Sequence, residues 1–204
     1  MKHSNKTKIS CVLGAAALVF SLTACGPAQP SSSQPETPPP SSQDTQEPQP
    51  TPLQQLKGEF EAVPKAYTPE QAAADNLLAV VQNKVQPSWE PLESFLKDVE
   101  AGRESVFKMV QYTTEGDPIL TGLAFDGAGI DGLYDNSRDT FAGTDDTGLT
   151  EFHYEFIKTF ESGDELYVYL LDDDTITLER LQADALKSDA SEPIGARLLF
   201  FVEK

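Results

Sequence analysis

The sequence predicts an α+β domain in which helices come first and strands follow. Apolar residues recur at helical spacing over residues 68–102, and from residue 105 onward they alternate with a period of two. Residues 56–204 are also the usual size of one domain. We therefore expect a twisted antiparallel sheet of about five or six strands, with two or three helices packed on one face.

Two helices are expected at the start of this domain. Thr68-Pro69-Glu70-Gln71 has the pattern of a capping box with proline at the first helical position, and an apolar stripe runs from it to about Lys84. The second helix begins at Pro91 and ends at Gly102. Its apolar residues share one face: Leu92, Phe95, Leu96 and Val99.

Six strands are expected after Gly102, over residues 105–113, 119–125, 130–134, 151–160, 165–171 and 196–202. The clearest alternation places Phe152, Tyr154 and Phe156 on one face of a strand. The other face carries Glu151, His153 and Glu155. One apolar and one polar face are typical of an antiparallel sheet. Residues 175–186 are predicted to form a further helix.

The N-terminal segment, residues 1–24, has the pattern of a lipoprotein signal peptide. A basic start precedes an apolar run of about ten residues, which is too short to span a bilayer as a mature helix. Leu22-Thr23-Ala24-Cys25 resembles the lipobox of bacterial lipoproteins. The resemblance implies that Cys25 receives a diacylglyceryl group, so that the membrane becomes a partner through this anchor.

Residues 25–55 are expected to be a disordered tether, because nine of the 27 residues from Gly26 to Pro52 are proline and most others are Ser, Gln or Thr. The chain has 33 acidic and 15 basic residues. This acidity disfavours nucleic acid as a partner, since phosphate binding depends on Lys and Arg. Cys11, the other cysteine, lies in the signal segment, so no internal disulfide is expected in the domain.

Two polar motifs carry a family resemblance: "YTTEGDPI" at residues 112–119 and "YDNSRD" at residues 134–139. With the helix and strand before them, they make residues 92–142 resemble the domain of unknown function 4362 family of small bacterial lipoproteins. Some members carry a cysteine pair in the later strands, which this chain lacks, and its segment from Asp172 to Pro193 is longer. That family has no assigned activity, so the resemblance implies location and fold.

The candidate catalytic residues are Glu115, Asp117 and Asp135. Glu115 and Asp117 could form a carboxylate pair for acid–base or metal chemistry, and the alternative function is a carboxylate-based hydrolase of a wall component. A structural corner is the favoured interpretation of Glu115–Pro118, because Gly, Asp and Pro are turn residues. Arg138, between Asp135 and Asp139, indicates an ion pair or a turn.

A calcium-stabilised module is a further alternative, since acidic loops occur at residues 126–132, 135–139, 143–148 and 171–175. None has the EF-hand spacing, and no metal site or cofactor is predicted. His153 is expected to be a surface histidine because one histidine cannot build a His-rich zinc site. Trp89 is expected to pack a helix start into the core.

These observations favour a lipid-anchored extracytoplasmic protein without enzymatic activity. We expect a binding or envelope accessory module whose partner is an envelope protein or a wall component. The long tether and the family resemblance favour the cell membrane of a Gram-positive bacterium.

Overall fold

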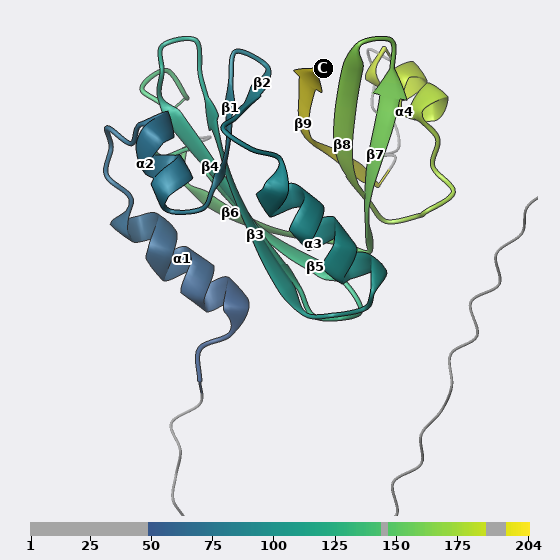
Figure 1. Cartoon of the computed structure of the whole chain (residues 1–204), viewed down its shortest axis with the longest axis horizontal. Helices are drawn as coiled ribbons and strands as arrows, with labels where there is room; N and C mark the ends of the chain where they lie inside the picture. The colour runs from purple at the N-terminus through teal and green to yellow at the C-terminus, as the bar shows by residue number, and fades with distance from the viewer. Residues whose placement is uncertain (1–48, 144–146, 187–194) are drawn as a thin grey trace, which may run out of the picture. The chain divides into compact units, whose positions relative to one another are not determined.

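Four helices and nine strands make up the part of the chain that this computed structural model describes, residues 49–143, 147–186 and 195–204 (Figure 1). The helices are α1 (Pro52–Ala62), α2 (Pro69–Ala74), α3 (Glu90–Glu100) and α4 (Leu178–Ala185). The strands are β1 (Leu78–Val81), β2 (Lys84–Gln86), β3 (Ser105–Tyr112), β4 (Pro118–Phe125), β5 (Ile130–Asp135), β6 (Leu149–Tyr154), β7 (Phe156–Ser162), β8 (Glu165–Leu171) and β9 (Ala196–Glu203).

The strands form two sheets, and the α+β prediction is confirmed. Sheet A has six strands in the order β2-β1-β3-β4-β5-β6, and sheet B has three in the order β7-β8-β9. Sheet A is mixed rather than purely antiparallel, because β1 pairs with β3 in parallel. This parallel pair arises because α3 lies between the two strands in the sequence, as in a crossover connection.

The expected strand over residues 151–160 is two strands in different sheets. The chain leaves sheet A after Tyr154, Glu155 donates its backbone N–H to the Leu171 carbonyl at 3.1 Å, and β7 begins at Phe156. Phe156 is therefore 39% exposed and does not share a buried face with Phe152. The alternation continues unbroken through Glu155, so periodicity alone could not locate the crossing.

Helices cover both faces of sheet A, which corrects the expectation of one covered face. Leu56 and Phe60 of α1 belong to an apolar cluster with Ala79 and Leu133, whereas Phe95 of α3 belongs to a second cluster on the other face. Sheet B completes the second cluster with Val168, Leu170, Leu199, Phe200 and Val202. The central strands are buried on both sides and cannot show a single wet face.

The helix expected from residue 69 to Lys84 ends at Ala74, and the rest of that segment is a hairpin. Asn76 has a left-handed φ of 60°, and its N–H donates to the Ala73 carbonyl at 3.2 Å, while Leu77 N–H donates to the Ala72 carbonyl at 2.8 Å. This is a Schellman C-cap built on asparagine instead of glycine. Residues 77–81 satisfy a helical pattern, yet they form a buried strand.

The β1–β2 turn consists of Gln82 and Asn83, both with positive φ, at 49° and 58°. Two consecutive positive φ values are the pattern of the two-residue turn that connects antiparallel strands. Gln-Asn lacks the glycine that usually marks this turn in a sequence. The hairpin is consequently a feature that composition did not reveal.

Helix α1 covers residues 52–55, which composition assigns to the tether. Thr51 accepts the Gln54 backbone N–H at 3.3 Å, and Gln54 Oε1 accepts the Thr51 N–H at 2.9 Å, which completes a capping box followed by proline at the first turn. Thr68 and Gln71 form the same box at α2, as the sequence predicts. The pattern Thr-Pro-x-Gln therefore starts two helices, and prolines around the first obscured it.

Candidate functional site

The segment Thr113–Asp117 is a tight turn between β3 and β4. Thr113 N–H donates to the Asp117 carbonyl at 3.0 Å, Asp117 N–H donates to Thr113 Oγ1 at 3.1 Å, and Gly116 has a φ of 93°. A φ in this range favours glycine. The turn residues thus have structural reasons for their positions.

The Asp117 carboxylate is engaged within the fold. Its Oδ2 accepts the Thr140 backbone N–H at 2.7 Å, and this hydrogen bond holds the pKa of Asp117 below its usual value. Glu115 is exposed on the same turn. A general acid needs a raised pKa at neutral pH, so the shift at Asp117 is opposite to what that role requires.

Asp135 forms a buried ion pair with Arg138. Arg138 Nη1 lies 2.6 Å from Asp135 Oδ2, and the two side chains are only 8% and 5% exposed. The guanidinium also donates to the Phe60 carbonyl and to the Val63 carbonyl, the latter at 2.8 Å from Nη2. Arg138 therefore caps the C-terminus of α1 and fixes that helix to the end of β5.

Burial raises the pKa of the Asp135 carboxyl, but hydrogen bonds from Ser137 and Arg138 outweigh it and hold the pKa below its usual value. Asp135 is thus an ionised partner of a structural arginine. The ion pair or turn expected at residues 135–139 is an ion pair with Asp135. Asp139 instead accepts the Phe141 N–H at 2.9 Å.

His153 is exposed on β6 among carboxylates. Its Nδ1 lies 2.8 Å from Asp131 Oδ1, opposite it on β5, and its Nε2 lies 3.7 Å from Glu155 Oε1. The hydrogen bond to Asp131 is the main cause that raises the pKa of His153 above 6.5. No group of three or more His, Cys, Asp or Glu side chains within the described ranges could hold a metal ion.

We expect Asp131→Asn to lower the pKa of His153, because the main hydrogen bond to the imidazolium then loses its charge. A raised folded-state pKa stabilises the domain fully below about pH 6.5, and this contribution is lost as pH rises through the folded pKa. NMR titration of the His153 ring protons measures the pKa, and unfolding experiments at several pH values measure the stability. Glu155→Gln is the matched control with a smaller expected shift. Equal shifts in the two variants would contradict this assignment.

Aspartates in the loops are used as turn acceptors. Asp126 Oδ1 accepts the N–H groups of Ala128 and Gly129, each at 2.9 Å, and Asp173 Oδ1 accepts the Thr175 N–H at 2.8 Å. Such side chain to backbone bonds are a common reason for aspartate in turns. In the acidic loop at residues 143–148, Thr144 to Asp146 lie outside the described residues.

A cavity of about 610 Å³ lies where three segments meet: residues 66–69 before and at the start of α2, residues 80–83 of the β1–β2 hairpin, and residues 111–114 with Gly116 at the end of β3. No lining residue is Asp, Glu, Lys or Arg, although 24% of the whole chain is charged. The sequence does not predict this cavity, because its walls come from three separate segments.

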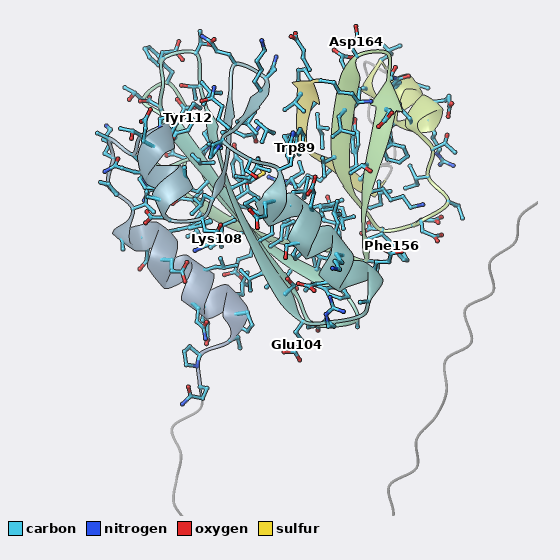
Figure 2. The ribbon with its side chains drawn as sticks, viewed as in Figure 1. Trp89, Glu104, Lys108, Tyr112, Phe156 and Asp164 are labelled. Atoms are coloured by element: carbon cyan, nitrogen blue, oxygen red, sulfur yellow. The ribbon has the colours of Figure 1, made fainter. Side chains whose placement is uncertain are left out.

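Tyr112 lines this cavity, and Figure 2 shows it beside α2. Its hydroxyl has less than 1 Å² of exposed surface and no hydrogen-bond partner in the described structure. Burial, followed by the nearby Glu70 carboxylate, raises the pKa of Tyr112 to about 12. The neighbouring Tyr67 differs, because its hydroxyl donates to Asp75 Oδ2 at 2.7 Å.

Tyr112→Phe is expected to leave the free energy of unfolding unchanged or to raise it by about 1 kcal/mol, because it removes a buried donor that lacks a partner. The matched control Tyr67→Phe should lower it by about 1–3 kcal/mol, since it removes a hydrogen bond to a carboxylate. Urea unfolding of both variants measures the difference. A Tyr112→Phe variant as destabilised as Tyr67→Phe would show that the Tyr112 hydroxyl has a partner in solution.

Trp89 is half-buried and packs against the core, as expected. It lies at the start of α3 (Figure 2), and its ring centroid is 6.3 Å from that of Phe200 on β9. It does not line the cavity. Of the candidate residues Glu115, Asp117 and Asp135, none lines the cavity either, although Gly116 does.

Cys25, the signal segment and the residues up to 48 lie outside the described residues. Within the described ranges, no helix combines the length and the apolar character that crossing a membrane requires.

Residues 79–168 match the family model named Domain of unknown function (DUF4362). Searches of curated proteins and of solved structures find no match to this chain. The matched region begins in β1, runs through α3 and the rest of sheet A, and ends in β8, so it includes both polar motifs that carry the resemblance. The domain of this chain thus resembles the DUF4362 family, as its sequence predicts.

Proposed function

We propose that this chain is a lipid-anchored extracytoplasmic protein whose domain binds a ligand of the cell envelope without converting it. The observation that carries the proposal is the 610 Å³ cavity with uncharged walls and the unpaired Tyr112 hydroxyl. A pocket with a few convergent polar groups is the default ligand site of a domain. The lipobox-like sequence at Cys25 and the proline-rich tether support the anchored location.

Binding is favoured over hydrolysis because two of the three candidate carboxylates are engaged within the fold. Asp117 accepts a backbone N–H from Thr140, and Asp135 is paired with Arg138. The pKa of each of these two aspartates is lowered, whereas a catalytic acid needs a raised pKa. Turnover of a wall sugar or peptide that is lost in Glu115→Gln would overturn the non-enzymatic assignment.

Thr114→Trp tests the cavity, because Thr114 is an exposed lining residue whose replacement should fill the space without disturbing the core. The purified full chain is titrated with fractions of solubilised cell envelope and followed by thermal unfolding. A ligand at 100 times its Kd adds about 2.7 kcal/mol, or roughly 5–10 °C for a domain of this size. We expect this rise in the unchanged chain and its loss in Thr114→Trp.

The matched control is Thr150→Trp, which places the same side chain at an exposed threonine of β6, at the other end of sheet A. It should retain the full rise. No rise in any fraction, or the same rise in Thr114→Trp as in Thr150→Trp, would overturn the cavity as the binding site.

The proposed anchor is tested separately in cells. Cys25→Ala should abolish incorporation of a labelled fatty acid and move the chain from the membrane fraction to the medium or to the soluble envelope fraction. The physical reason is that acyl chains hold the protein by about 0.8 kcal/mol per buried CH₂. Cys11→Ala is the matched control and should still yield lipidated protein. Unchanged labelling in Cys25→Ala would exclude this cysteine as the lipid attachment site.

A further inference from the structure

The charge of the cavity walls limits the class of ligand. A charged ligand group in a pocket is normally met by an opposite charge, because its desolvation is costly otherwise. This cavity has no charged lining residue, and the chain as a whole carries a formal charge of −18, which repels anions. The walls therefore favour an uncharged ligand.

The polar groups on the walls favour a ligand with many hydroxyls. Gln82 and Asn83 of the β1–β2 turn bring side-chain amides, and Thr113 and Thr114 bring hydroxyls. Each of these groups can donate and accept hydrogen bonds. A sugar hydroxyl also does both, so amides and hydroxyls match it better than carboxylates, which only accept. Two aromatic side chains, Tyr67 and Tyr112, add apolar ring surface that suits the C–H faces of a pyranose.

An extended peptide fits this site less well. Peptides that bind by strand addition need a free strand edge. The strands at the cavity are interior: β1 is paired with β2 and β3, and β3 is paired with β1 and β4. Only side chains and turn residues therefore face a ligand here.

We propose that the cavity binds a neutral saccharide, with the amides of Gln82 and Asn83 and the threonine hydroxyls as the hydrogen-bonding groups and with Tyr112 at its wall. This inference rests on the proposed binding function and names its ligand class. The Tyr112 hydroxyl is almost shielded from solvent, so a ligand reaches it only by shifting the side chains that cover it. Once reached, this donor gains the partner that it lacks in the free protein.

The test is calorimetric titration of the full chain with four-unit oligosaccharides. The neutral probes are the β-1,4-linked tetramers of N-acetylglucosamine, glucose and xylose, and the maltose-type tetramer of glucose. Size-matched charged controls are the tetramers of glucosamine and of galacturonic acid. We expect at least one neutral probe to bind and both charged controls to bind at least tenfold more weakly. Free sugars and the glycan of the cell wall both present neutral hydroxyl groups. Binding of the N-acetylglucosamine tetramer but not of the glucose tetramers would indicate wall glycan, and the reverse would indicate a free sugar.

Two variants locate the binding. Gln82→Ala and Tyr112→Phe should each weaken the binding of the neutral probe at least tenfold, while Thr150→Trp should not. The unfolding midpoint of Tyr112→Phe without ligand should not fall, which separates lost binding from lost folding.

The outcomes separate the two proposals. Binding of a peptide or of a charged probe that Thr114→Trp abolishes would keep the binding function and overturn the saccharide class. Absence of binding to all neutral probes, or neutral binding that persists in Gln82→Ala and Tyr112→Phe, would also overturn the saccharide class. If envelope fractions also give no rise in the unfolding midpoint that depends on the cavity, both proposals fail.

Discussion

Arg138→Met is expected to lower the free energy of unfolding by about 3–5 kcal/mol, because breaking a buried ion pair leaves an unpaired buried charge. The variant keeps a long side chain but removes every donor. Asp135, with only 5% of its side chain exposed, loses its guanidinium partner. The carbonyls of Phe60 and Val63 at the end of α1 lose their donor as well. At about 2–4 °C per kcal/mol, the unfolding midpoint should fall by roughly 6–20 °C.

The matched control is Arg103→Met, which breaks an ion pair with Asp98 at the surface. Arg103 is 56% exposed, so we expect its loss to cost about 1 kcal/mol or less. Hydrogen exchange should also show faster opening of residues 52–62 in Arg138→Met, and no such change in Arg103→Met. If the two variants have the same midpoint, the buried pair does not hold α1 in place.

The pH dependence of stability gives a second measure of the same pair. The folded pKa of Asp135 is below its ordinary value of 3.8, so its contribution is complete above that value and is lost as pH falls through the folded pKa. In Arg138→Met, the Asp135 carboxylate loses the guanidinium that stabilises its charge. Its burial should therefore raise the pKa of Asp135. The destabilisation relative to the unchanged chain should therefore shrink as the pH is lowered through the acid range, because protonation removes the unpaired charge.

Gly132→Ala is expected to lower the free energy of unfolding by about 1–3 kcal/mol, the usual cost of overpacking. Gly132 lies opposite Phe152 in the β5–β6 pair, and a Cβ at Gly132 would come within 1.8 Å of Phe152 Cε2. The Phe152 ring would have to move. That ring also lies 4.3 Å from the Arg197 guanidinium carbon of β9, so its displacement weakens a contact between sheets A and B.

Two controls isolate the close approach at Gly132. Gly58→Ala, at an exposed position in α1 with no atom within 4 Å of the added Cβ, should raise the free energy of unfolding by about 0.5–1 kcal/mol. Phe152→Leu replaces the ring by a smaller side chain, so Gly132→Ala should cost less in that background, and the double-mutant cycle measures the coupling. Additive effects of Gly132→Ala and Phe152→Leu would contradict the steric account.

Local sequence patterns were enough to predict several elements. Helix α3 covers Glu90–Glu100, as its one-sided apolar face predicts, and Gly102 adopts the left-handed φ of 64° that ends it. Strand β8 has the predicted bounds, Glu165–Leu171. These predictions depend on neighbours within one or two turns, which the sequence states directly. The α1 capping box is equally local, but it lies among prolines whose composition is typical of a tether.

Residues 75–86 show where local patterns fail. Their apolar spacing fits a helix as well as it fits a strand, and the deciding residues, Asn76, Gln82 and Asn83, have positive φ without being glycine. Leu78 and Ala79 are fully buried because β1 lies between β2 and β3, which is a tertiary environment. Packing on both faces of sheet A therefore decides that this segment forms a strand and not a helix.

The candidate site also has features that the sequence predicts and features that only the folded chain shows. The sequence by itself determined the α+β class, most strands, the turn at Glu115–Pro118 and the family resemblance, and it left an ion pair or a turn open for Arg138. Only the tertiary structure decided that Arg138 also reaches the Val63 carbonyl, 75 positions away, and that residues 66–69, 80–83 and 111–114 with Gly116 line one cavity. The physical reason is that a helix or a turn is stabilised by neighbours along the chain. A buried charge and a binding cavity are instead stabilised by groups that only the folded chain brings together.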